Sequence, residues 1–229
     1  MSSLLNLVAP IDIGQTDTTS LFVKGFASVE TVDRSKDIVS PTEFKVEQFM
    51  AAPTLLVNHQ FWHDRSGNPV AVGKVVSAFP AMLAEGSDPE MWQVIDLQTQ
   101  KAANTFPKAK TPNLKAGSRG LFVVAEVTEP DVQLRAKAGE YSAFSWRGLA
   151  DSYPAFDMMN GAQRTFKNID LMEISLVNMP ANPDATLVIG KSLDGSNADL
   201  VLYSVLLDKA FFSSEGVSAS FLQAHHLKS

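Results

Sequence analysis

Residues 171–185 read LMEISLVNMPANPDA and form the most informative stretch of the chain. The first half is an apolar run, typical of a buried strand, that one carboxylate, Glu173, interrupts. Such a carboxylate lies either on the solvent face of a strand or paired inside the sheet. Pro180 and Pro183 then end the run abruptly. We therefore expect one or two strands within residues 163–179, ending at a tight turn.

The rest of the chain also has mainly the patterns of strands. Two segments have helical patterns: residues 41–52, where Pro41 follows a possible Ser40 cap, and residues 130–140. Residues 80–118 have the composition of an inserted, partly mobile loop. Many strands with few helices predict a mainly β fold with peripheral helices, as a barrel or a strongly bent sheet. The further strands are expected at residues 21–29 (LFVKGFASV), 37–39, 54–59 (TLLVNH), 70–79, 119–127 (RGLFVVAEV) and 141–149.

Composition changes divide the chain into three parts. Residues 1–20 have the pattern of an N-terminal arm, and residues 21–189 that of one folded domain. Residues 190–229 begin as a Gly/Ser-rich linker and continue as a tail in which residues 199–212 have helical apolar spacing. We expect this tail either to dock on a scaffold or to be removed by self-cleavage.

The composition also limits the possible functions. The chain has 229 residues, a net charge of −6 and no cysteine, which excludes disulfides, a thiol nucleophile and thiolate metal sites. An acidic chain does not favour nucleic acid as the main partner. The N-terminus lacks the charged region of a signal peptide, and no apolar run is long enough to span a membrane. The expectation is a soluble, cytoplasmic protein.

Four histidines are candidates for acid–base chemistry. His59 ends an apolar strand, where it is either a general base at the sheet rim or a partly buried histidine bonded to backbone. His63 lies four residues further, but the strand-then-turn pattern and the lack of an HExxH motif disfavour a metal site. His225 and His226 lie near the C-terminus, where we expect solvated side chains.

Ser142 and Ser145, in the run YSAFSWRG, are candidate nucleophiles or ordinary strand serines. Alternation along a strand places Ser145 and Arg147 on one face, opposite Phe144 and Trp146, so Ser145 is the more accessible serine.

Two kinds of carboxylate could complete such a site. Glu173 could orient a histidine, although a solvent-facing role fits its pattern as well. Asp33 and Asp37 flank a turn, where aspartate is common for backbone reasons.

Taken in order, segments between residues 21 and 185 resemble the prohead (capsid maturation) serine proteases of tailed bacteriophages, the caudovirus prohead proteases. That family is similar in fold to the herpesvirus maturation proteases, which implies an antiparallel β-barrel surrounded by helices. It also implies a serine endopeptidase that cleaves scaffold protein, capsid protein and often itself. The matching segments are GFASV (25–29), the D-x-x-x-D turn (33–37), IVSPTEF (38–44), LLVNH (55–59), VGKVVSAF (72–79), RGLFVVAEV, the serine strand and LMEISLVNMPANPDA.

The resemblance implies roles for residues at the matching positions. Ser145 is the expected nucleophile and His59 the general base. Glu173 is expected to orient His59, with Asp37 as second choice. The family requires no cofactor or metal. For the oxyanion, the candidates are Arg147 and the backbone of Asn178, Met179 and Ala181.

The implied partners are the phage scaffold protein and the major capsid protein as substrates. The expected state is a homo-oligomer inside the assembling procapsid, in the host cytoplasm, bound to neither nucleic acid nor membrane. One departure supports an alternative: Trp146 and Arg147 precede Gly148, where the family has one small or aliphatic residue before the glycine. The alternative is a catalytically inactive, capsid-associated homologue that binds scaffold.

Overall fold

The computed structural model describes residues 21–64, 66–155 and 161–189. The expected N-terminal arm, the linker, the tail, His225 and His226 lie outside the described residues. Within them, no helix is long and apolar enough to cross a membrane.

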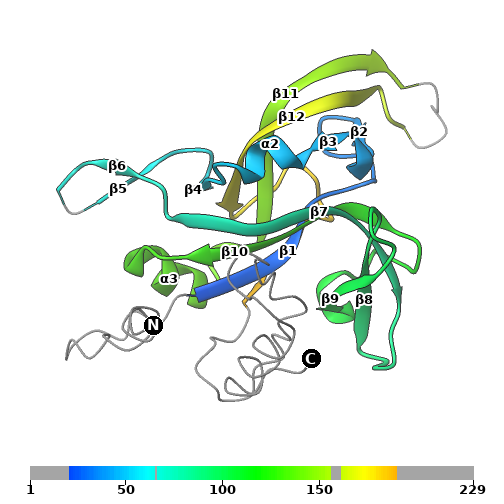
Figure 1. Ribbon diagram of the computed structural model, residues 1–229, viewed down its shortest axis with the longest axis horizontal. Coiled ribbons are helices and arrows are strands. Elements are labelled where there is room, and N and C mark those ends of the chain that lie inside the picture. The colour runs from blue at the N-terminus through cyan, green and yellow to red at the C-terminus, as the bar shows by residue number, and fades with distance from the viewer. Residues whose placement is uncertain (1–20, 65, 156–160, 190–229) are drawn as a thin grey trace, which may run out of the picture.

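The described chain is mainly β, as the sequence predicts, and most of its strands join one eleven-stranded sheet (Figure 1). Its helical elements are short: α2 (Val46–Met50), α3 (Pro130–Lys137) and the 3₁₀ turns η1 (Pro41–Glu43) and η2 (Lys108–Lys110). The strands of the large sheet are β1 (Leu21–Val29), β2 (Asp37–Val39), β3 (Phe44–Lys45), β4 (Leu55–Val57), β7 (Gly73–Glu85), β8 (Met91–Asp96), β9 (Ala102–Pro107), β10 (Arg119–Val127), β11 (Ala143–Pro154), β12 (Arg164–Val177) and β13 (Val188–Ile189). The separate hairpin is β5 (Trp62–His63) with β6 (Pro69–Val70).

The sheet is open, so the expectation of a closed antiparallel barrel is wrong. Its main path runs β11-β12-β4-β7-β10-β1-β13, and β12 pairs in parallel with β2, β3 and β4. Strand β1 is paired with β10 on one edge and β13 on the other, which leaves β11 with β12 as its partner. Cα atoms of β1 and β11 nevertheless come within 8 Å of each other. The sheet therefore curls until its two ends are close, without a hydrogen-bonded ladder between them.

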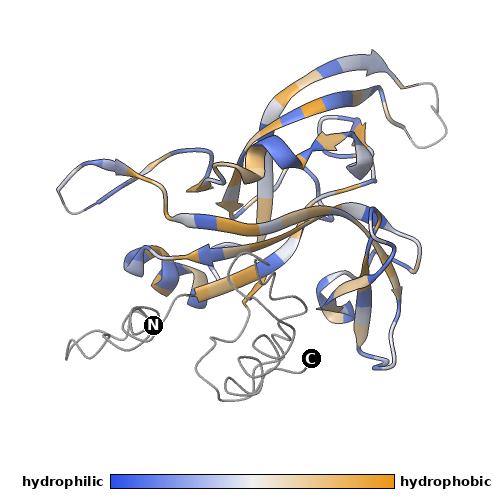
Figure 2. Ribbon diagram, in the orientation of Figure 1, coloured by the Kyte–Doolittle hydropathy of each residue, from blue (hydrophilic) through white to orange (hydrophobic). Residues whose placement is uncertain are grey.

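The core of the described residues has two large clusters and a small one of Ala143, Val177 and Ala185. Apolar side chains of β1, β4, β10, β11 and β12 form the larger one, and its central strands are largely hydrophobic in Figure 2. In the second cluster, the rings of Phe26, Phe106 and Phe122 pack edge to face with centroids 5.1–5.9 Å apart. Such fully buried aromatic side chains each contribute about 1.5–3 kcal/mol of transfer free energy.

Residues 80–118 are not a loop, in contrast to the prediction. They form the end of β7, the strands β8 and β9, and η2. Val94 and Phe106 are fully buried and Trp92 nearly so, in the same cluster as Phe26. A meander on the end of β7 thus extends the core, because the alternating apolar residues of β8 and β9 face it.

The helix predicted over residues 41–52 is also largely wrong. Phe44 and Lys45 instead pair in parallel with Ile169 and Asp170 of β12, which confines the α-helix to Val46–Met50. Burial of the Phe44 ring in the core accounts for the break. The second predicted helix is confirmed as α3.

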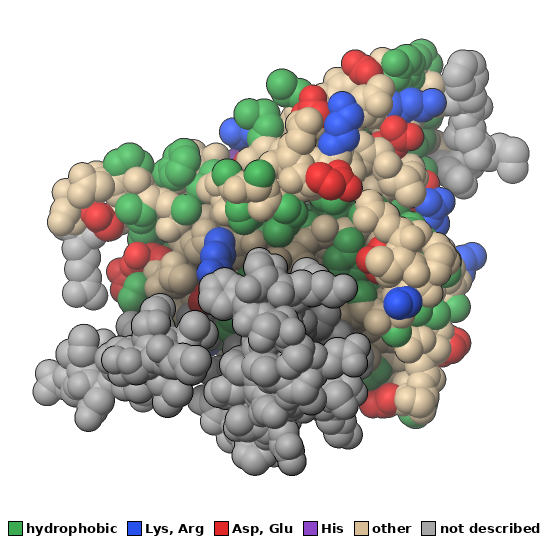
Figure 3. Space-filling view, in the orientation of Figure 1, with side chains coloured by type: hydrophobic (Ala, Val, Ile, Leu, Met, Phe, Trp, Pro, Cys, Tyr) green, Lys and Arg blue, Asp and Glu red, His purple; other side chains and the backbone are tan. Residues whose placement is uncertain are grey.

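The far half of β11 and β12 forms an arm at the end of the sheet, where β12 also pairs with β2 and β3 (Figure 1). Leu149, Tyr153 and Met172 on this arm are exposed apolar side chains. On the face shown in Figure 3, acidic and basic side chains are interspersed over the surface.

Candidate active site

His59 lies on a strained two-residue turn that follows β4. Asn58 and His59 both have left-handed backbones, with φ of 49° and 63°. Such non-glycine conformations cost about 1–3 kcal/mol each and persist where the surrounding structure fixes them. Here the backbone N–H of Asn58 donates to the carbonyl of Leu176 on β12, at 3.0 Å. The turn therefore places the imidazole over β12 instead of allowing β4 to continue.

Ser145 reaches the same place from the neighbouring strand. On the β11–β12 ladder, Ser145 lies opposite Ser175 and Arg147 opposite Glu173. Directly opposed residues share one face of a sheet, as do residues two apart on one strand. Ser145, Ser175 and Glu173 therefore lie on one face, and Trp146 lies on the other, where its ring packs edge to face on Phe44 at 4.9 Å.

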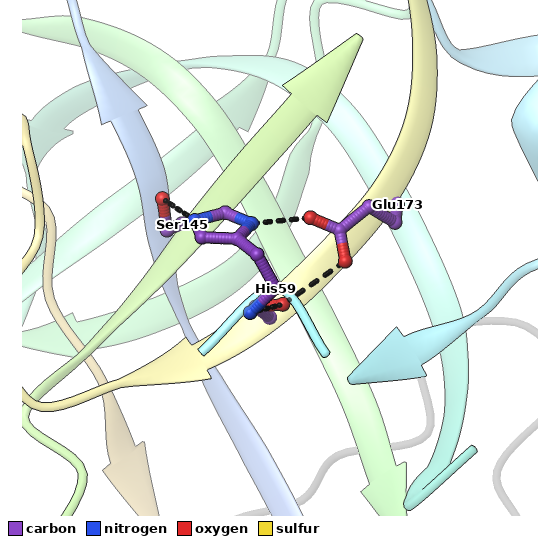
Figure 4. A network of polar contacts seen from close by, with 4 residues as sticks. His59, Ser145 and Glu173 are labelled. Carbon is purple, nitrogen blue, oxygen red and sulfur yellow. Dashed lines mark hydrogen bonds and ion pairs between the residues drawn. The ribbon is translucent and has the colours of Figure 1, made fainter. Parts of the chain in front are cut away.

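The imidazole of His59 lies between Ser145 and Glu173 (Figure 4). Its Nε2 is 3.0 Å from the Ser145 hydroxyl, and its Nδ1 is hydrogen bonded to Oε1 of Glu173. Because an ionised carboxylate can only accept, Nδ1 carries the proton, and the Nε2 lone pair accepts from the Ser145 hydroxyl. The arrangement can remove a proton from Ser145 and hold the resulting imidazolium beside a negative charge.

Ser175 completes this network, and the sequence interpretation missed it. Its side chain is fully buried. The hydroxyl accepts from the backbone N–H of His59 at 3.0 Å and donates to Oε2 of Glu173 at 3.1 Å. The detectable signal was its position two residues after Glu173, on the same face of a strand that is otherwise apolar.

A hollow of about 180 Å³ opens beside Ser145, in the gap where β1 and β11 do not pair. Its lining comes from β1, β2, β11 and β12 and from the segments around Asp33 and Asn182. Its lining residues are Ala27, Ser28, Thr31, Asp33, Asp37, Val39, Ser145, Trp146, Phe166, Pro180, Ala181 and Asn182.

Asp37, the second choice for the orienting carboxylate, is bound to Arg164. Its two oxygens accept from Nε and Nη2 of Arg164, each at 2.8 Å, and its side chain is buried. This fork raises the pKa of the Arg164 guanidinium above its ordinary value, chiefly through the hydrogen bond to Asp37. Glu173, by contrast, is the carboxylate that bonds the His59 ring.

One of the four expected oxyanion residues, Ala181, lines the hollow beside Ser145. Arg147 is exposed, and Met179 is 74% exposed. The carbonyl of Asn178 accepts a hydrogen bond from Ser142, the other candidate serine, at 2.9 Å. Ser142 is exposed and Ser145 half-buried, so the expectation that Ser145 is the more accessible serine is wrong.

His63 is exposed on the β5–β6 hairpin and does not join the network of His59. Among the described residues, no group of three or more His, Asp or Glu side chains is placed to hold a metal ion.

Residues 108–197, less than half of the 229-residue chain, match the sequence model of a peptidase family. That family is the caudovirus prohead serine protease family, so the resemblance seen in the sequence is confirmed. The match contains Ser145 and Glu173, whereas His59 precedes it.

Among solved structures, the chain is similar to the KSHV protease in complex with a hexapeptide phosphonate inhibitor. The TM-score is 0.37 and the identity 12%, over 76% of this chain and 66% of that one. The chain thus spans just under two thirds of that protease's length. Curated proteins give no match.

Proposed function

We propose that this chain is a serine endopeptidase of phage prohead maturation, with Ser145 as nucleophile and His59 as general base. Glu173 acts through His59 as a positioning residue. One observation carries the proposal: the hydrogen-bonded series Ser145–His59–Glu173 stands at the edge of a hollow large enough for part of a substrate. The family match over residues 108–197 supports the same reaction class.

In the proposed reaction, the Ser145 oxygen attacks the carbonyl carbon of the scissile peptide bond, and His59 Nε2 takes the hydroxyl proton. The tetrahedral intermediate collapses, the C–N bond breaks, and His59 returns the proton to the leaving amine. Water, deprotonated by His59, then hydrolyses the acyl-enzyme and restores the Ser145 hydroxyl. Glu173 remains a carboxylate throughout and stabilises the imidazolium through Nδ1–H.

The family name supports substrates within the phage procapsid. We propose that these are scaffold protein and major capsid protein, that the protease acts inside the assembling procapsid, and that it also cleaves its own chain. A homo-oligomer remains part of this proposal. The packing of Trp146 against Phe44 accommodates the residue that departs from the family pattern, and this supports an active enzyme over the inactive homologue.

The test combines covalent labelling with substrate cleavage. A fluorophosphonate probe is incubated with the full chain, and the modified residue is located by peptide mass spectrometry. In parallel, the chain is mixed with the scaffold and capsid proteins of its phage. Ser145→Ala should abolish both signals. Ser142→Ala is the matched control, because Ser142 lies on the same segment and its hydroxyl is bonded to Asn178 instead of His59.

Labelling of Ser145 with Ser145-dependent cleavage supports the proposal. A folded wild-type chain that binds scaffold but neither cleaves it nor reacts at Ser145 would instead establish the inactive homologue.

A further inference from the structure

The hollow beside Ser145 has the size of one side chain. A cavity of about 150 Å³ holds a benzene ring, and the hollow measures about 180 Å³. It lies between β1 and β11, and the nucleophile proposed above is part of its lining. A peptide attacked by Ser145 therefore has a neighbouring side chain within reach of this hollow.

The lining of the hollow combines apolar and acidic residues. Its apolar members include Val39, Phe166 and Trp146. Such walls suit the aliphatic stem of a long side chain. The lining also contains two carboxylates, Asp33 and Asp37, and among the described residues no lysine, arginine or histidine lines it.

The two carboxylates are not equivalent. Arg164 neutralises Asp37 through both oxygens. Asp33 uses Oδ1 to accept the backbone N–H groups of Ser35 and Asp37, at 2.8 and 2.9 Å, and forms no ion pair within the described part of the chain. The nearby Arg34 is exposed, and its guanidinium donates to the carbonyl of Pro180. Asp33 thus leaves one carboxylate oxygen at the hollow, and Arg164 acts on its charge through space, without a direct ion pair.

Ser28 provides a second, independent indication of a ligand. It is 3% exposed, it lines the hollow, and its hydroxyl makes no side-chain hydrogen bond within residues 21–64, 66–155 and 161–189. It follows an irregularity in the β1–β10 register between Phe26 and Ser28. Bulges of this kind redirect side chains and are frequent next to active sites. The Ser28 hydroxyl is not one of the fully enclosed atoms that lack a partner, and an occupant of the hollow can hydrogen bond to it.

We infer that the hollow binds a basic side chain of the substrate, an aliphatic stem with a cationic end such as that of lysine. This inference rests on the proposed function, because it assigns the hollow to the peptide that Ser145 attacks. The stem packs against the apolar part of the lining, and the cationic end donates to Asp33 and to the Ser28 hydroxyl.

The test measures charge preference next to the scissile bond. A peptide library is digested by the full chain, and the cleavage sites are mapped by mass spectrometry. Matched synthetic peptides then carry lysine or its neutral isostere norleucine at the selected position. We expect kcat/KM to be about tenfold higher for the lysine peptide, the effect of a charge-assisted hydrogen bond.

The decisive variant is Asp33→Asn, which retains Oδ1 and the turn but removes the charge. Its preference for lysine should fall to about twofold or less. Asp64→Asn is a closely matched control. Oδ1 of Asp64 accepts hydrogen bonds from the backbone N–H groups of Ser66 and Asn68, as Oδ1 of Asp33 does from those of Ser35 and Asp37. Asp64 lies on the β5–β6 hairpin, outside the hollow. This control should keep the wild-type preference. Ser28→Ala should lower kcat/KM for the lysine peptide more than for the norleucine peptide.

The outcomes separate this inference from the proposed function. Ser145-dependent cleavage without a preference for a basic residue next to the scissile bond would overturn the inference and leave the function standing. An Asp33→Asn variant that keeps the full preference for lysine would also overturn the inference and leave the proposed function standing. If no cleavage depends on Ser145, the proposed function is refuted and the inference with it.

Discussion

Replacing Ser175 with alanine tests whether this buried hydroxyl holds the catalytic histidine in place. In the structure, the Ser175 hydroxyl joins the backbone N–H of His59 to Oε2 of Glu173. The substitution removes both hydrogen bonds and leaves a donor and a carboxylate oxygen without that partner. Glu173 is 6% exposed, so water replaces the lost bond poorly.

The expected magnitude follows from these two bonds. A neutral hydrogen bond contributes about 1 kcal/mol and one to a charged group about 1.5–3 kcal/mol. Part of this total is lost from the free energy of unfolding, and part from the orientation of His59. If about 1.5–3 kcal/mol falls on the orientation, the rate of Ser145 modification drops by about 10- to 150-fold. The loss should appear in kcat and leave KM nearly unchanged, because Ser175 does not line the hollow.

The assay compares fluorophosphonate labelling rates at Ser145 with urea unfolding of the same proteins. Thr111→Val is the matched control, because Thr111 is also buried and its hydroxyl also makes two hydrogen bonds. It accepts from Trp92 Nε1 at 2.9 Å and donates to the Lys108 carbonyl at 3.2 Å, and neither partner belongs to the Ser145–His59–Glu173 network. It should lower stability without lowering kcat. NMR should show the His59 Nδ1–H proton less protected from exchange in Ser175→Ala. A variant that labels at the wild-type rate with unchanged protection of this proton would refute the reasoning.

Three further outcomes are expected. Glu173→Gln should slow peptide cleavage less than Ser145→Ala, measured as kcat/KM, because Glu173 orients His59 and transfers no proton itself. Ser145→Ala combined with His59→Ala should be scarcely slower than either single variant in the same assay, because the two residues act as a unit. Phe122→Ala should lower the free energy of unfolding by about 3–5 kcal/mol in urea titrations, because Phe122 is fully buried among aromatic rings.

The mainly β class and most strand positions could be predicted from local sequence. Strand β10 is a clear example, because its nine residues coincide with the run RGLFVVAEV. Alternation also placed Trp146 on the core side of β11, as the Phe44 contact shows. Such features depend on a residue's immediate neighbours, which the sequence displays directly.

Features that depend on distant pairing could not be predicted in this way. Phe44 has good helical neighbours, yet pairing with Ile169, which is 125 residues away, keeps it in a strand. Residues 80–118 contain Pro, Gly and Lys, which are typical of loops. Their alternating apolar side chains stabilise strands only because they pack on Phe26 and its neighbours, which lie far away in the sequence. Tertiary packing overrides local propensity in both places.

For the candidate site, the sequence supplied residue types and the structure supplied their distances. No local pattern gives the left-handed turn at Asn58 and His59, because its cost is offset by a hydrogen bond to Leu176 on another strand. Alternation along the strand places Ser175 on the same face as Glu173. The pattern of β12 does not show that this serine bonds to His59, because His59 lies on a distant turn.

The open edge of the sheet explains why the network and the hollow occur together. Had β1 paired with β11, backbone hydrogen bonds would fill the gap beside Ser145, as they fill every other gap along the main path. Strand β1 instead pairs with β13 at Val23 and Lys24. Its later residues bond to the segment that follows β12. The Phe26 carbonyl accepts from the Thr186 N–H, and the Val29 carbonyl accepts from the Asn182 side chain. These bonds satisfy the edge of β1 without β11. The strand that carries Ser145 is thereby left beside a hollow, where a substrate can approach the hydroxyl that His59 bonds.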